Sequence, residues 1–302
     1  MHSTKAKGYI LGAVAAASYG LNPLFALPLY AEHLSVTSVL FYRFSIAFVI
    51  LGIIMAVRGM SFRLTKKEVL PVIAMGLCNT FSAMLLFIGY NYMGSGIAST
   101  ILFVYPIIVA LIMGLFFHER LSAVAWGALF VAFLGIACLG KTSSGEILSV
   151  TGTMFVLGSA LAYALYMVGV NRSVLKTMSP FKLNFYVMVV CTIFFSLRGM
   201  LTTGIELPQS GLGWTCAVGL AIFPTIISLL TLTAAIHYVG STITAILGAL
   251  EPLTALFFGV LVFGEEVTAL NTLGILLVIL AVTAIVCEGT ITKFIKTKIL
   301  SR

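Results

Sequence analysis

The chain has no aspartate and few charged residues of any kind. Asp and Glu together number 9, and charged residues make up 9% of the 302 residues, against about 25% in a typical soluble domain. Apolar residues make up 61%, and the mean hydropathy is +1.16. About 20 apolar residues suffice to cross a bilayer. The composition therefore excludes a soluble globular class and indicates a multi-span membrane protein.

Motifs of enzymes and ATPases are also missing. The chain has no Walker A loop, His-Glu-x-x-His, Cys-x-x-Cys or Gly-x-Ser-x-Gly, and its predicted loops are too short for a soluble catalytic domain. The five cysteines lie singly in apolar runs, which argues against a disulfide framework or a metal site. They are Cys78, Cys138, Cys191, Cys216 and Cys287. We therefore expect no cofactor, no metal and no ATP-driven transport by this chain alone.

Ten hydrophobic segments follow one another along the chain. The first has the composition of a signal peptide, but nine more spans follow it, so we expect a retained helix. The segments are 8–30, 36–57, 69–92, 96–117, 122–140, 149–171, 181–201, 212–238, 242–263 and 268–288. A short loop, 141–148, divides them into two groups of five.

Lys and Arg are distributed unevenly between alternate loops. If both termini are cytoplasmic, the outer side holds only Lys141 and Arg198, and Arg43 lies within a span. The inner side then holds Lys5, Lys7, Arg58, Arg63, Lys66, Lys67, Arg120, Arg172, Lys176, Lys182, Lys293, Lys296, Lys298 and Arg302. This positive-inside bias predicts cytoplasmic termini in the inner (plasma) membrane of a bacterial-type cell. It also accounts for the net charge of +8, which then indicates no nucleic-acid partner.

One stretch of the chain occurs twice. Tyr92-Met93-Gly94-Ser95 returns as Tyr238-Val239-Gly240-Ser241, and at the same offset Pro106 returns as Pro252. Each copy then ends in a glutamate. Two apolar segments would seldom share these special residues by chance, so we interpret the stretch as an internal duplication. Because five spans per repeat is an odd number, the two halves must enter the membrane in opposite directions, which is typical of secondary transporters.

The chain also carries Tyr19-Gly20-Leu21-Asn22-Pro23 in the first span, Arg43-Phe44 in the second, and two Pro-to-Glu helices, each followed by a glycine-bearing helix. In these features it resembles the EamA-type ten-helix branch of the drug/metabolite transporter superfamily, over nearly its whole length. The family usually has Trp-Gly at positions 19–20, and the second repeat lacks a counterpart of Arg43.

The resemblance implies an all-α integral membrane fold with ten transmembrane helices as two inverted five-helix repeats. The repeats would be 1–140 and 149–288, followed by a basic cytoplasmic tail, 289–302. Spans one, three, four, six, eight and nine would line a central site between the halves. Family members carry amino acids, sugars, nucleotide conjugates or drugs, so the resemblance leaves the substrate open.

Two charged residues lie inside predicted spans, where a charge costs roughly 2.5–3.5 kcal/mol on insertion scales. We expect Glu251, near the middle of its span, to be the substrate-binding or coupling residue. An apolar environment lets a carboxylate exchange a proton, and a carboxylate can also pair with a substrate ammonium. Arg43 is a candidate for docking an anionic group of the solute. For both residues the alternative is a structural role that holds helices together.

Pro106 and Pro252 predict helix kinks, because each proline leaves the carbonyl four residues earlier, such as that of Gly248, without its donor. Gly248 also removes side-chain bulk one turn before Glu251, so a ligand or water could approach there. Tyr105 occupies, in the first copy, the position of Glu251 in the second. A phenol would then face a carboxylate across the pseudo-twofold axis.

Other polar residues inside spans are weaker candidates for contact with a solute, because small polar groups in membrane helices often bond to a neighbouring helix. These candidates are Asn22, Asn79, Tyr90, Tyr163, Tyr166 and Ser228.

Together these features predict a secondary transporter that moves a small metabolite across the inner membrane by alternating access. An amino acid or similar amphipathic solute is the first candidate, export the favoured direction, and the proton the candidate coupling ion. A sugar, a nucleotide-linked metabolite or a drug is the alternative substrate. A membrane-embedded enzyme or a scaffold subunit is the alternative class, although an enzyme needs a clustered catalytic set and a scaffold needs no charge at Glu251. The sequence predicts no oligomeric state.

Overall fold

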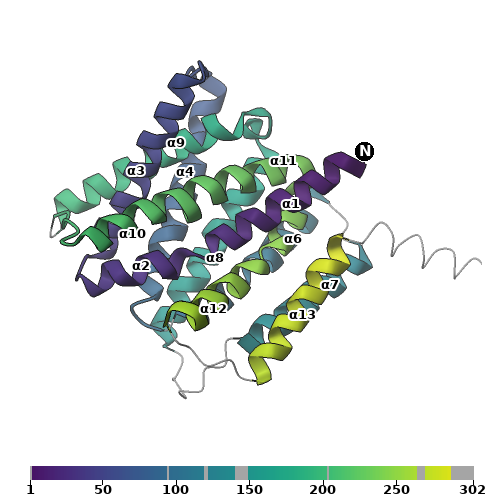
Figure 1. Cartoon of the computed structure of the whole chain (residues 1–302). Helices are drawn as coiled ribbons and strands as arrows, with labels where there is room; N and C mark the ends of the chain where they lie inside the picture. Colours follow the sequence, from purple (N-terminus) through teal and green to yellow (C-terminus); the bar gives the residue numbers. More distant parts are fainter. Residues whose placement is uncertain are drawn as a thin grey trace, which may run out of the picture.

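The computed structural model describes residues 2–93, 95–118, 122–139, 149–202, 204–263 and 269–286, and over these ranges the chain is helical with no strand (Figure 1). The all-α integral membrane fold predicted from the sequence is confirmed. The α-helices are α1 (His2–Tyr19), α2 (Asn22–Ala31), α3 (Val36–Val57), α4 (Lys66–Gly89), α5 (Ser95–Leu102), α6 (Tyr105–Phe117), α7 (Ala123–Leu139), α8 (Val150–Arg172), α9 (Pro180–Leu201), α10 (Gly211–Ala221), α11 (Ser228–Leu247), α12 (Leu250–Phe263) and α13 (Ala269–Val286). A 3-10 helix, η1 (Val174–Thr177), and a π-helix, η2 (Ile222–Ile227), complete the set.

Six helical segments are long and apolar enough to cross a membrane. They are Lys5–Ala31, Val36–Val57, Lys66–Gly89, Val150–Arg172, Pro180–Leu201 and Gly211–Leu247. Four shorter apolar helices are also present, two after the first three long segments and two after the last three: Tyr105–Phe117, Ala123–Gly135, Leu250–Val262 and Thr272–Ala281. The number of ten spans and the repeat boundaries stay predictions. The predicted loop 141–148 and tail 289–302 lie outside the described residues.

Most of the long helices begin at a serine or threonine cap, as their sequences direct. The Ser35, Ser149, Ser179 and Ser210 hydroxyls each accept a hydrogen bond from the backbone N–H three residues later. Thr65 and Glu68 form a capping box at the start of α4.

The helix pairing repeats with the two halves exchanged. Helix α1 of the first half packs against α11 of the second half. Helix α8, which opens the second half, packs against α4 of the first half. Two further pairs join the halves, α3 with α9 and α7 with α13. Figure 1 shows α7 and α13 side by side at one edge of the bundle, apart from α3 and α9.

The duplicated stretch is interrupted at the same place in both copies. In the first copy α5 ends at Leu102 and α6 begins at Tyr105, and in the second α11 ends at Leu247 and α12 begins at Leu250. Gly240 has φ 85°, so the second copy also begins with a break from the preceding span. The first half-helix of one copy, α5, packs against the second half-helix of the other, α12. That the two copies run in opposite directions through the membrane stays a prediction.

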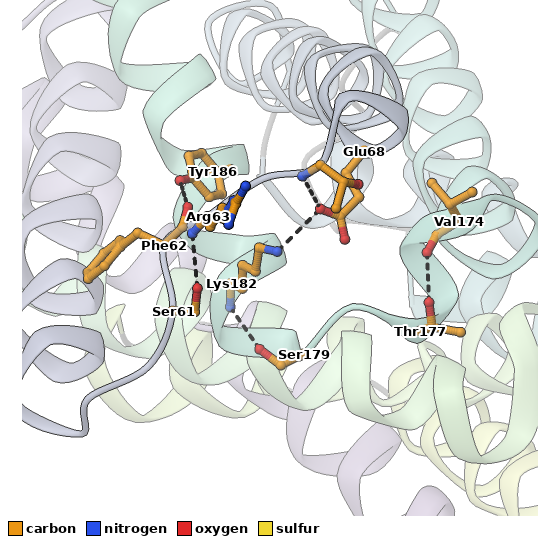
Figure 2. Close-up of polar contacts among 10 residues, drawn as sticks. Ser61, Phe62, Arg63, Glu68, Val174, Thr177, Ser179, Lys182 and Tyr186 are labelled. Carbon is orange, nitrogen blue, oxygen red and sulfur yellow. Dashed lines mark hydrogen bonds and ion pairs between the residues drawn. The ribbon is translucent and has the colours of Figure 1, made fainter.

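Loops from the two halves are joined at both ends of the bundle. At the end where α1 begins, Lys182 at the start of α9 forms an ion pair with Glu68 at 3.3 Å, and the Tyr186 hydroxyl donates to the Phe62 carbonyl (Figure 2). At the opposite end, Glu206 accepts from the Ser35 N–H at 2.5 Å and from the Ser38 hydroxyl at 2.9 Å.

Candidate functional site

Three helix breaks mark the middle of the molecule. They lie between α1 and α2, between α5 and α6, and between α11 and α12. The half-helices that follow each carry a proline in their first turn, in the pairs Asn22-Pro23, Tyr105-Pro106 and Glu251-Pro252. Because proline needs no N–H donor there, it suits the first turn of a helix. The predicted kinks at Pro106 and Pro252 are thus interruptions of the helix just before each proline.

Two glycines allow these breaks to touch. A Cβ atom at Gly20 would collide with the carbonyl oxygen of Glu251, and one at Gly248 would collide with the Tyr105 hydroxyl. The first span therefore meets the α11–α12 break through Gly20, and the start of α6 meets it through Gly248. Both contacts bring Glu251 and Tyr105 into the same region.

Three tyrosines form a continuous aromatic wall there, which we call the tyrosine cluster: Tyr19, Tyr105 and Tyr163. The rings of Tyr19 and Tyr163 stack with their centroids 5.8 Å apart, and those of Tyr105 and Tyr163 meet edge-on at 4.8 Å. All three are buried. They come from α1, α6 and α8, so the cluster spans both halves of the chain.

Glu251 is a buried carboxylate without a hydrogen-bonding partner. Its side chain is 6% exposed, and within the described ranges no group donates a hydrogen bond to it or pairs with it as a cation. Its oxygens are not among the fully enclosed side-chain atoms that lack a partner in the described ranges, so the carboxylate keeps a small accessible surface. The groups within electrostatic range of the carboxylate are Arg43, Tyr19, Tyr90, Tyr105 and Tyr163.

Arg43 is held by a set of neutral oxygens, which we call the Arg43 node. Its Nε donates to Thr225 Oγ1 at 2.7 Å, Nη1 to Asn22 Oδ1 at 2.9 Å and Nη2 to the Pro224 carbonyl at 3.2 Å. The guanidinium also lies over the Tyr19 and Phe87 rings, 5.7 and 5.5 Å from their centroids. Arg43 thus joins α3 to α2 and to η2. This favours the structural alternative for Arg43 itself, since its contacts are with neighbouring helices.

The π-helix η2 supplies two of these oxygens. Its wider turn leaves the Pro224 carbonyl free to accept from Arg43, and the Thr225 hydroxyl both accepts from Arg43 and donates to the Leu220 carbonyl at 2.8 Å. Single-turn π-bulges occur often at functional sites. The only sign of this π-helix in the sequence is weak: a proline followed by a threonine within an apolar run.

The other predicted site residues make hydrogen bonds or ring contacts outside the tyrosine cluster. Asn79 donates to Cys191 Sγ of α9 at 3.5 Å, and the Ser228 hydroxyl donates to the Ala15 carbonyl of α1 at 2.9 Å, so both join helices. Tyr166 stacks on Tyr163 at 6.4 Å, but its hydroxyl faces Asn184 at 3.5 Å. Tyr90 lies at the end of α4, where its ring contacts Phe87 at 5.4 Å.

Two expectations for Gly248 are wrong. Its carbonyl is not left without a donor, because the Glu251 N–H donates to it at 2.9 Å in a tight turn. The space beside its α-carbon is not open to a ligand, because the Tyr105 hydroxyl occupies it. The Tyr105 hydroxyl lies against Gly248, and the expected facing of the Tyr105 phenol and the Glu251 carboxylate stays a prediction. The role of these residues in binding stays a prediction.

The part of the chain that the structure describes contains no group of three or more His, Cys, Asp and Glu side chains arranged to hold a metal ion.

Comparison with known proteins yields one family. Residues 6–140 and 150–287 each match the sequence profile described as the EamA-like transporter family. The two matches together cover most of the chain, and each covers one set of five predicted spans.

Relatives and a solved structure agree with this match. The uncharacterized transporter YdfC of Bacillus subtilis (strain 168) is 25% identical over 69% of this chain and 68% of its own length. The uncharacterized transporter YxxF of the same organism is 22% identical over 82% of this chain and 81% of its own length. A solved structure, titled only as a crystal structure of a protein, has TM-score 0.79 and 16% identity, covering 92% of this chain and 96% of its own, which shows a shared fold.

Proposed function

The chain belongs to the EamA-like transporter family, and from this premise we propose that it is a secondary transporter of a small amphipathic metabolite, with an amino acid as the first candidate. The named relatives are described as uncharacterized transporters, which supports this class. In this proposal the solute crosses the inner membrane by alternating access, in the direction of export, and both termini are cytoplasmic.

The observation that carries the proposal is the unpaired Glu251 carboxylate beside the tyrosine cluster. A carboxylate at membrane depth is costly unless a cation or proton completes it. An ammonium group satisfies its charge and hydrogen bonds, and aromatic rings attract the same cation through their faces. A phosphate-bearing solute would be repelled, so the geometry disfavours nucleotide-linked metabolites.

Glu251 has two roles in the proposed cycle, and they compete for the same oxygens. A proton entering from one side neutralises the carboxylate and releases the ammonium, and loss of the proton on the other side restores the binding form. The three helix breaks offer the flexible points at which the site opens to either side. Coupling to the proton gradient follows from this competition.

Replacing Glu251 with glutamine tests the proposal. Glu251→Gln keeps the shape of the side chain but removes the charge. We expect solute affinity to fall about ten- to a hundredfold, because a charged hydrogen bond contributes roughly 1.5–3 kcal/mol. We also expect loss of pH-driven accumulation in proteoliposomes loaded with a labelled amino-acid mixture.

Two proteins are compared with Glu251→Gln as folding controls. One is wild type, and the other is Asn171→Asp, which alters a buried amide that donates to Ser241 at 3.0 Å. If Glu251→Gln protein transports with unchanged affinity and pH response, Glu251 is structural and the proposed mechanism is wrong.

A further inference from the structure

The loop between α3 and α4 is fastened across the start of α9, at the end of the bundle where α1 begins. The Tyr186 hydroxyl donates to the Phe62 carbonyl, and Lys182 pairs with Glu68 at 3.3 Å (Figure 2). The Phe62 ring also meets the Phe185 ring edge-on, with their centroids 5.2 Å apart. The loop belongs to the first half of the chain and α9 to the second, so these contacts join the halves and hold the loop in place.

Cations from both halves gather around this loop. The 3-10 helix η1 packs against α4, which brings η1 beside the loop and the start of α9. The stretches 58–68 and 174–182 together contain six cations and one carboxylate, Glu68. We call the six cations the basic surface: Arg58, Arg63, Lys66, Lys67, Lys176 and Lys182. The distribution of charge along the sequence predicts that they share one side of the membrane, and the packing makes them neighbours.

Most of the basic surface has no anionic partner within the protein. Glu68 is already used, because it accepts from the Thr65 N–H at 2.8 Å and pairs with Lys182. Over the described ranges no acceptor bonds to the side chains of the exposed cations Arg63, Lys66, Lys67 and Lys176. Like charges that a fold holds close together repel one another, so an external anion at this surface would stabilise the folded protein.

Apolar and aromatic side chains border the basic surface. Val57, at the end of α3, is 82% exposed, and Leu70, in the first turns of α4, is 74% exposed. Phe62 and Tyr186 lie between these apolar spans and the cations. Aromatic residues at the end of a membrane span are typical of the headgroup level of a bilayer. The basic surface therefore lies at the depth of lipid phosphates, which favours a lipid over an anion from bulk water.

We propose that the basic surface binds the phosphate of an anionic phospholipid, which bridges the α3–α4 loop and the segment formed by η1 and the start of α9. Clusters of about four to eight Lys and Arg beside a transmembrane helix are typical of anionic-lipid binding, and basic pockets between helices take such headgroups. The acyl chains lie along the exposed apolar ends of α3 and α4. Bound lipid thus ties the two halves together at this end, in addition to the Lys182–Glu68 pair. The surface lies outside the tyrosine cluster, so the inference does not depend on the transported solute.

A variant that combines Arg63→Gln, Lys66→Gln and Lys67→Gln tests the proposal, because it removes three exposed cations and leaves Glu68 and Lys182 in place. The purified full chain in a neutral detergent is titrated with phosphatidylglycerol, which is anionic, and with phosphatidylcholine, which is zwitterionic. Bound lipid and thermal unfolding are both measured. We expect wild type to bind phosphatidylglycerol at least about tenfold more tightly, and only this lipid to raise its Tm. The triple variant should lose at least about tenfold in affinity for phosphatidylglycerol, since each cation contributes about fivefold.

A matched control removes the same charge from the C-terminal tail, through Lys293→Gln, Lys296→Gln and Lys298→Gln. This control should keep the wild-type preference, and an equal loss would mean that net charge, and not the basic surface, attracts the lipid. Inorganic phosphate at the same concentration is the second comparison. If it raises the Tm as much as phosphatidylglycerol does, the surface binds a free anion and the lipid assignment is wrong. The proposal is also overturned if wild type binds both lipids equally or if the triple variant keeps the preference.

Discussion

Gly248 sets the distance between Tyr105 and the α11–α12 break. Because the Tyr105 hydroxyl fills the space where a Cβ atom would lie, Gly248→Ala should force the phenol away. We expect a loss of about 1–3 kcal/mol, the usual cost of overpacking, measured as thermal unfolding in detergent. Gly248→Ala combined with Tyr105→Phe should recover part of this loss.

Gly127 in α7 is the matched control, since nothing lies within 4 Å of its Cβ position. Gly127→Ala should be neutral or stabilising, because alanine favours a helix interior. Equal losses at both positions would mean that the effect of Gly248→Ala does not come from Tyr105.

At single residues the sequence indicates which side chains are costly in a membrane but not what they touch. Glu251 and Arg43 stand out because charges are rare in spans, and the structure places both within electrostatic range of Tyr19. From the sequence, Asn79 and Ser228 looked as suitable for binding a solute as Asn22. The helical spacing shows which residues share a helix face, but it does not show which helix packs against that face. The structure alone shows that α9 and α1 take up those two side chains.

At the level of whole elements, features with a local cause can be predicted from the sequence, as the interruptions before Pro106 and Pro252 show. The serine caps and the capping box at Thr65 have local causes, because each is formed by residues three positions apart. The π-helix η2 and the tight turn at Gly248 depend on contacts with Arg43 and Tyr105. Such tertiary causes leave little trace in a single sequence.

Helix caps are exchanged between α3 and α10 at the end of the bundle away from the start of α1. Glu206, just before α10, bonds to the N-terminus of α3, and Glu32, just before α3, accepts from the Gln209 N–H at 2.9 Å and from the Ser210 hydroxyl at the N-terminus of α10. The Ser210 hydroxyl and the Gln209 N–H hold the pKa of Glu32 below its ordinary value. For Glu206, burial opposes the shift, but hydrogen bonds from Ser35 and Ser38 outweigh it and lower the pKa.

Both carboxylates should therefore stabilise the protein only when ionised. Because their folded pKa lies below the unfolded value of about 4.3, the contribution is present above that pH and disappears as the pH falls through the folded pKa. We expect Glu206→Gln to lower stability at pH 7 by about 1 kcal/mol, the usual worth of a cap. Glu32→Gln should act in the same direction.

Thermal unfolding between pH 7 and 3 measures this, and the gap between wild type and each variant should close in acid. Gln209→Ala is the control, because Gln209 offers only its backbone N–H to Glu32. A gap that persists at the lowest pH would show that the carboxylates act through shape and not through charge.

The whole molecule follows the duplication, and its orientation in the membrane stays a prediction. The described contacts gather basic residues at the end where α1 begins: Lys7 lies over Tyr238, Arg58 over Phe181 and Lys182 beside Glu68. This grouping agrees with the uneven distribution of Lys and Arg along the sequence. The repeat boundaries and the membrane orientation could be argued from the sequence, because the spacing of the spans and the distribution of charge are patterns of the whole chain.

Cysteine labelling from outside intact cells tests the orientation. A single cysteine at position 141 should react with an impermeant maleimide, whereas one at position 296 should react only after the membrane is opened. A cysteine-free parent serves as the control. Equal accessibility at both positions would contradict the predicted topology.

The exchanged caps also bear on how the protein is made. Glu206, which completes the start of α3, is synthesised long after α3 itself, so the Ser35 N–H must wait for the second half of the chain. Glu32 is synthesised early, but α10, the helix whose N-terminus it caps, is synthesised much later. Each half therefore enters the membrane with an unfinished edge that only the other half completes, so co-translational assembly should proceed through a half-inserted intermediate that is open at this end.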